Sequence, residues 1–85
     1  FMAYKQLTKL IREKTQRKET IETKVLNLYE ASNPSLYYVY EVLGDYYAAI
    51  QQTDTAITYW QKALTMPIPK QAEKVRIQQK INKNQ

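Results

Sequence analysis

The chain has 85 residues, with 13 Lys and Arg against 8 Asp and Glu, and a formal net charge of +5. It contains no Cys and no His, which excludes disulfides, thiolate and imidazole metal sites, and catalysis by a Cys–His or Ser–His pair. A chain of this length folds as one small domain, and no apolar run in it is long enough to span a membrane. We therefore expect one domain without a metal or another cofactor.

Residues 3–32 contain neither Gly nor Pro, and their apolar side chains recur at helical spacing. This pattern permits one continuous amphipathic helix over residues 3–31, which is the favoured interpretation. The segment 12–20 is polar on every face and contains Thr residues that are mediocre helix formers. A break near residues 15–19 therefore stays open as the alternative.

A continuous N-terminal helix would extend well beyond the rest of the domain, because each helical residue rises about 1.5 Å. Its free half would expose an apolar patch of Leu7, Leu10 and Ile11, which we name as a candidate docking patch. We expect a second copy of the chain or an upstream part of a larger protein to cover it. A break that lets the helix fold back is the alternative. Phe1 precedes Met2, and we favour a cut edge of a longer polypeptide over an added residue.

Ser32–Asn33–Pro34 closes the N-terminal segment and supplies a cap and a first-turn proline for the next helix. Two apolar periodic runs follow, Leu36–Ile50 and Ala56–Met66, with the polar residues 51–54 between them. This order predicts a helical hairpin over residues 34–67.

The predicted core of the hairpin consists of the residues that face inward from both helices. They are Tyr40, Leu43, Gly44, Tyr47, Ala56, Trp60, Ala63 and Leu64. Gly44 opposite Ala56 and Ala63 would let the two helix axes approach closely while the large rings interlock around them.

The spacing of these residues resembles one tetratricopeptide repeat, a helical hairpin of about 34 residues. The matching positions, within about Tyr37 to Lys70, are Tyr40, Leu43–Gly44, Tyr47, Ala56, Tyr59–Trp60, Ala63–Leu64 and Pro67. The chain departs from the family pattern at Pro67, which comes one residue early, and at Gln51, where the family usually has Gly. The missing Gly predicts a turn without a left-handed residue. The resemblance covers this one repeat and implies a module that binds proteins or peptides.

In this family one face of the first helix lines the groove that holds a partner peptide, so the resemblance names a candidate surface. It consists of Tyr38, Glu41, Asp45 and Ala49. Because two of these residues are acidic, we expect them to repel a carboxylate and the groove to accept a neutral or basic peptide. Glu41 and Asp45 do not indicate catalysis or a cation site, since no third carboxylate, nucleophile or phosphate-binding loop accompanies them.

Pro67–Ile68–Pro69 ends the hairpin and permits a last helix over about residues 70–82. Its thin apolar edge would consist of Ile68, Ala72, Val75 and Ile81, with Lys and Arg covering the remaining surface. A thin apolar edge with a polar back is typical of a helix that caps a repeat array.

We therefore divide one all-α domain into an N-terminal amphipathic helix over 1–33, a hairpin over 34–67 and a capping helix over 68–85. The expected function is non-catalytic protein–protein interaction or scaffolding. Three alternatives stay open: a C-terminal helical appendage of a larger enzyme or surface protein, a homo-oligomer, and a nucleic-acid-binding domain. The last is disfavoured, because the basic groups alternate with acidic ones as on an ordinary helix surface. The sequence does not indicate a compartment, and the cytoplasm is only the default expectation.

Overall fold

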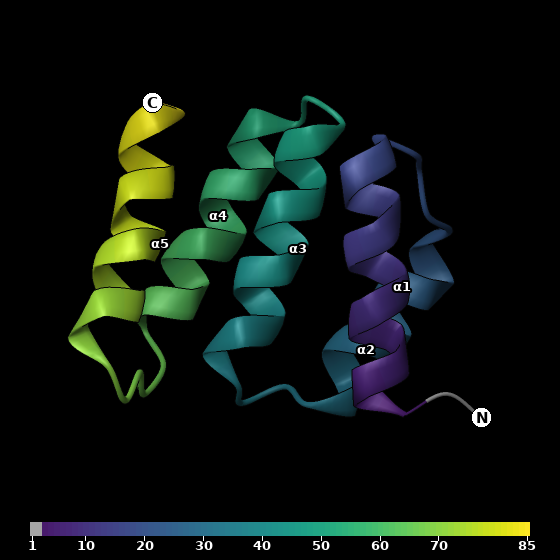
Figure 1. The fold of residues 1–85 in the computed structure, drawn as a ribbon, viewed down its shortest axis with the longest axis horizontal. Coiled ribbons are helices and arrows are strands. Elements are labelled where there is room, and N and C mark those ends of the chain that lie inside the picture. Colours follow the sequence, from purple (N-terminus) through teal and green to yellow (C-terminus); the bar gives the residue numbers. More distant parts are fainter. Residues whose placement is uncertain (1–2) are drawn as a thin grey trace.

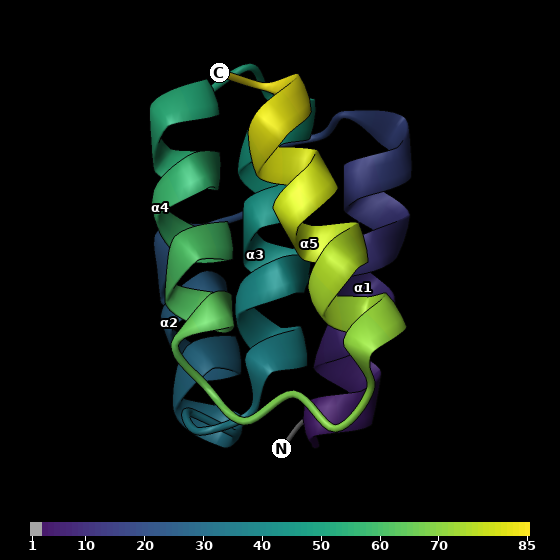
Figure 2. The ribbon, with the colours of Figure 1, turned by 90° about the vertical axis from the view of Figure 1, so that its left-hand side faces the viewer.

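The computed structural model describes residues 3–85, and this range is built from five α-helices without a strand (Figure 1). They are α1 Tyr4–Arg17, α2 Thr23–Ser32, α3 Tyr37–Ala49, α4 Thr53–Leu64 and α5 Gln71–Lys83. The predicted all-α fold with a central helical hairpin is confirmed. Figure 2 shows α2 and α4 towards the left and α1 towards the right, with α5 in front of α3 between them.

The N-terminal segment is two helices, so the prediction of one continuous helix is wrong and the alternative break is right. The chain leaves α1 at Lys18, whose φ of 57° lies in the left-handed region, and the Glu19 N–H closes the turn by donating to the Lys14 carbonyl. The reason is that the polar segment has no apolar surface that would reward extending the helix. The connection back to α2 is held by the Ile21 N–H, which donates to the Tyr46 Oη at 2.9 Å.

The break also removes the candidate docking patch. Leu7 and Ile11 are fully buried in the core of the domain, where α1 packs against α3, and Leu10 is half-buried. The expectation of an exposed patch that needs a second copy or an upstream segment is therefore wrong. The same residues supply the apolar face on which the chain folds back.

The hairpin of α3 and α4 contains the predicted core. Six of the eight predicted core residues are buried, and Tyr47 and Leu64 are half-buried against them. Trp60 lies directly on Gly44, because a Cβ at residue 44 would come within 2.3 Å of the indole Nε1. The close approach expected of Gly44 is thus made against the indole ring.

The turn between α3 and α4 differs from its prediction. Gln51 has a φ of 65°, so the turn does use a left-handed residue, although the chain places no Gly there. The Gln51 side chain is exposed, and the backbone N–H of Gln51 donates to the Ala48 carbonyl at 3.1 Å. The turn is therefore formed at the expense of backbone strain.

We expect Gln51→Gly to stabilise the protein by about 0.5–1 kcal/mol. The left-handed conformation costs an L-residue roughly 1–2 kcal/mol, and Gly removes this cost. The greater conformational freedom of Gly in the unfolded chain offsets part of the gain. Urea unfolding measures the change. Gln61→Gly is the control, because Gln61 is exposed within α4 and has no left-handed conformation to relieve, so this substitution should destabilise. Equal effects of the two substitutions would contradict the explanation.

The last helix packs against α4 through a different face from the predicted one. Ile77 and Ile81 are buried, whereas Val75 is 43% exposed and Ala72 is exposed. The predicted apolar edge is therefore correct only at Ile81 and at the half-buried Ile68. The orientation of α5 also brings two of its cations, Arg76 and Lys80, onto α3.

Candidate functional site

A polar groove lies between α1 and α5, with α3 as its floor. Its larger part is a hollow of about 340 Å³ lined by Arg12, Tyr38, Glu41, Asp45, Glu73, Arg76 and Lys80. A smaller hollow of about 170 Å³ is lined by Arg12, Thr15, Gln16, Val42 and Asp45. Because Arg12 and Asp45 line both hollows, we treat the two as one surface and call it the groove.

The floor of the groove holds a buried carboxylate. Glu41 is only 2% exposed, and Arg76 binds it in two places, from Nε to Oε2 at 2.8 Å and from Nη2 to Oε1 at 2.7 Å. The Lys80 Nζ donates a third bond to Oε2 at 2.7 Å. A buried carboxylate is stable only with such charged donors, so α5 supplies what the burial of Glu41 requires.

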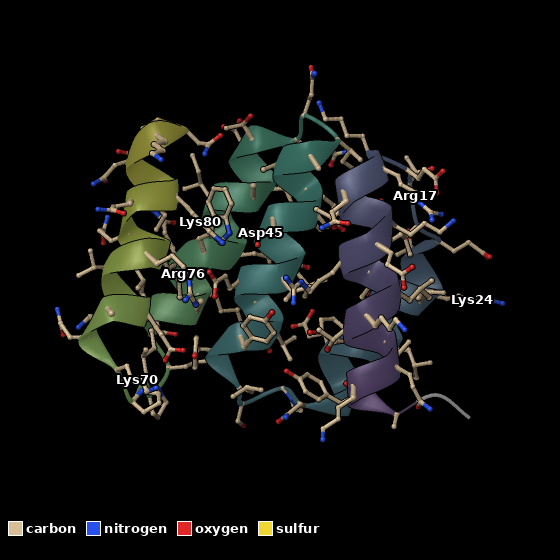
Figure 3. The ribbon with its side chains drawn as sticks, viewed as in Figure 1. Arg17, Lys24, Asp45, Lys70, Arg76 and Lys80 are labelled. Carbon is tan, nitrogen blue, oxygen red and sulfur yellow. The ribbon has the colours of Figure 1, made fainter. Side chains whose placement is uncertain are left out.

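Asp45 lies one turn further along α3, beside Lys80 (Figure 3). It shares this lysine with Glu41. The Lys80 Nζ donates to Oδ1 at 2.9 Å and to Oδ2 at 3.0 Å, and the Trp60 Nε1 donates to Oδ1 at 3.2 Å. The groove is thereby connected to the hairpin core through Trp60, whose Nε1 also approaches the Glu41 carbonyl at 3.3 Å.

The two carboxyl groups have pKa values shifted in opposite directions. Burial acts to raise the pKa of Glu41, but the hydrogen bonds from Arg76 and Lys80 outweigh it and hold this pKa below its ordinary value. Burial raises the pKa of Asp45, and the bonds from Lys80 only partly oppose it. The hydrogen bonds to Glu41 raise the pKa of Arg76. Glu41 and Arg76 therefore form a fully charged pair at neutral pH.

The surface predicted to be acidic is neutralised, because cations of α5 pair with both of its carboxylates. Glu41 is buried and neutralised from α5, so it is not available to contact a partner, and Asp45 is half-exposed but bound to Lys80. Tyr38 lines the groove and is half-exposed, whereas Ala49 is half-buried and lines neither hollow. The reason given for a neutral or basic peptide, repulsion by free carboxylates, is therefore wrong.

The cations of the groove were missed at the sequence level. Arg12, Arg76 and Lys80 belong to helices whose basic side chains we expected to cover ordinary exposed surface. One signal could have paired α5 with α3: Arg76 and Lys80 are four residues apart, as are Glu41 and Asp45. Equal spacing of opposite charges on two helices allows both pairs to form at once.

The side chains that line the groove are mostly charged or polar. Within residues 3–85, no group of three or more Asp and Glu side chains is placed to hold a metal ion. Every buried side-chain nitrogen and oxygen of that range has a hydrogen-bond partner. No helix of the described range is long and apolar enough to cross a membrane.

Comparisons with protein-family models, with curated proteins and with solved structures found no match to this chain.

Proposed function

We propose that this chain is a non-catalytic helical-repeat module of the tetratricopeptide type, and that it binds a segment of a partner protein in the groove. The observation that carries the proposal is the spacing of the helices. The helices α1, α3 and α5 begin at residues 4, 37 and 71, so successive starts lie 33 and 34 residues apart. A tetratricopeptide repeat has a period of about 34 residues.

The arrangement of the helices also supports the proposal. Stacked repeats bury a continuous core and leave a concave surface for binding. Here α1, α3 and α5 surround the groove, and α2 and α4 lie on the opposite side (Figure 2). The chain thus contains two helical pairs and a last helix in the position of a further first helix.

The first pair lacks the sequence signature because its second helix is shifted along the chain. The helices α2 and α4 begin at residues 23 and 53, 30 residues apart. In this register Tyr29 corresponds to Tyr59 instead of Ala63. Tyr29 is fully buried, stacks on Tyr4 with ring centroids 5.7 Å apart, and accepts a hydrogen bond from Thr8 Oγ1 at 2.9 Å. A search of the sequence at a fixed 34-residue period therefore does not align α2 with α4.

We expect peptides selected from a random library to perturb the backbone NMR signals of α1 and α3 around Arg12, Gln16 and Tyr38. Tyr38→Ala should weaken their binding about tenfold, since a half-exposed aromatic ring in a groove is the usual anchor of such contacts. The matched control is Leu28→Ala on α2, which removes a side chain that is 52% exposed and lies outside the groove. Perturbations confined to α2 and α4, or a library that yields no binder, would contradict the proposal.

A further inference from the structure

The outer surface of α1 carries three cations in a row beside the groove. Lys5, Lys9 and Arg12 follow one another at steps of four and three residues, which places them on one helix face. They line a hollow of about 350 Å³ together with Thr8, Glu13 and Gln16. Arg12 and Gln16 also line the groove, so this surface, here called the α1 face, continues into it.

The cations of the α1 face differ from those of α5 in their bonding. Arg76 and Lys80 are bound to Glu41 and Asp45. Within residues 3–85, no hydrogen bond or ion pair joins the side chains of the cations in the α1 row to a partner. The α1 face therefore presents charge that is free to meet a ligand.

The electrostatic balance of the whole surface follows from these pairings. The carboxylates of Glu41 and Asp45 are already compensated, so they do not offset the α1 row. Glu13 and Glu73 are the other acidic groups that line this surface, and the protein as a whole carries a net charge of +5. Complementary charge guides partner choice and encounter, so the surface favours an anionic segment over a cationic one.

We propose that the groove binds an acidic segment of a partner protein, whose carboxylates lie along α1 against Lys5, Lys9 and Arg12. This inference rests on the proposed function and names the partner class. Gln16, one turn beyond Arg12 and exposed, can hydrogen-bond the backbone of such a segment.

A protein segment fits the surface better than a nucleic acid does. Glu13 beside the row of cations and Glu73 on α5 would repel a continuous phosphate backbone, whereas a peptide can place its carboxylates against the cations alone. Among residues 3–85, no aromatic side chain lines the α1 face for a base to stack on.

Fluorescence anisotropy at low ionic strength tests the proposal with four labelled probes: oligoglutamate, oligoglutamine, oligolysine and single-stranded DNA. Oligoglutamate should bind most tightly. Arg12→Glu should weaken its binding about tenfold, and Lys5→Glu and Lys9→Glu about fivefold each, because each reversal replaces attraction by repulsion. The matched control is Lys24→Glu on α2, where the side chain points away from the groove (Figure 3). This control should change the affinity by less than about twofold.

The outcomes separate this inference from the proposed function. Equal losses in Lys24→Glu and Arg12→Glu would show attraction by net charge alone and overturn the inference. Tighter binding of DNA or of oligolysine than of oligoglutamate would also overturn the inference of an acidic partner. Tighter binding of oligolysine would still agree with a groove that binds peptides. If no peptide binds, either here or in the NMR experiment, both the inference and the proposed function are overturned. Arg12→Gln, which keeps the helix and removes only the charge, should give an intermediate loss of about threefold, and an affinity equal to that of the parent would count against the inference.

Discussion

Trp60→Ala is expected to lower the free energy of unfolding by about 3–5 kcal/mol. Trp60 is 2% exposed, and its Nε1 donates to the Asp45 Oδ1 and approaches the Glu41 carbonyl. The loss is comparable with the whole stability of a domain of this size, which is roughly 0.05–0.15 kcal/mol per residue. Urea unfolding followed by circular dichroism measures it. A variant that unfolds cooperatively at nearly the same urea concentration as the parent would contradict the assignment of Trp60 to the core.

Gly44 supplies an internal control for this prediction. In the parent, Gly44→Ala should destabilise, because its Cβ would meet the rigid indole at 2.3 Å and overpacking usually costs about 1–3 kcal/mol. In the Trp60→Ala background the same substitution should stabilise by up to about 1 kcal/mol, since the ring is gone and Ala favours a helix more than Gly does. If Trp60→Ala does not fold, Trp60→Leu provides the background. The same sign in both backgrounds would disprove the contact.

The hairpin could be predicted from the sequence because its signals are local. Small residues at Gly44, Ala56 and Ala63 mark where two helices approach, and Trp60 fills the space between them within a stretch of about 20 residues. The end of each helix was less certain: α3 begins at Tyr37, after a turn at Pro34 and Ser35, and not at the proline itself.

The break after α1 could only be offered as an alternative, since the chain marks it with neither Gly nor Pro. Lys18 adopts the left-handed conformation without a residue type that signals it. The choice is made by burial of Leu7 and Ile11 against α3, which is a tertiary effect. Periodicity alone does not distinguish a long helix from a helix that folds back.

The residues that α3 contributes to the candidate site were predicted, and their partners on α5 were not. Tyr38, Glu41 and Asp45 were placed on one face of α3, and all three line the groove. The pairing that neutralises the acidic residues was not predicted, because Arg76 and Glu41 are separated by 35 residues and belong to different helices. A charge pattern on one helix shows which residues share a face but does not show which partner covers that face.

The combined variant Arg76→Ala with Lys80→Ala is expected to lose about 3–5 kcal/mol of stability at neutral pH. It leaves the carboxylate of Glu41, 2% exposed, without either of its charged donors, and a buried charge without a partner is strongly destabilising. The control is Lys74→Ala with Lys83→Ala, which removes the same charge from exposed positions of α5. This control should change stability by less than about 1 kcal/mol.

Acid should reverse the effect of removing the two donors. In the parent, the lowered pKa of Glu41 means that its contribution is present at neutral pH and is lost as the pH falls through that pKa. Without Arg76 and Lys80 only burial acts, so the pKa of Glu41 rises, and protonation on acidification removes the buried charge. Asp45, whose pKa burial already raises, loses Lys80 and changes in the same direction. The deficit measured by urea unfolding should therefore shrink between neutral pH and about pH 4, and adding Glu41→Gln to the variant should restore part of it at neutral pH. A deficit that is constant with pH and unaffected by Glu41→Gln would mean that Arg76 and Lys80 stabilise α5 through packing of their aliphatic stems instead of through charge.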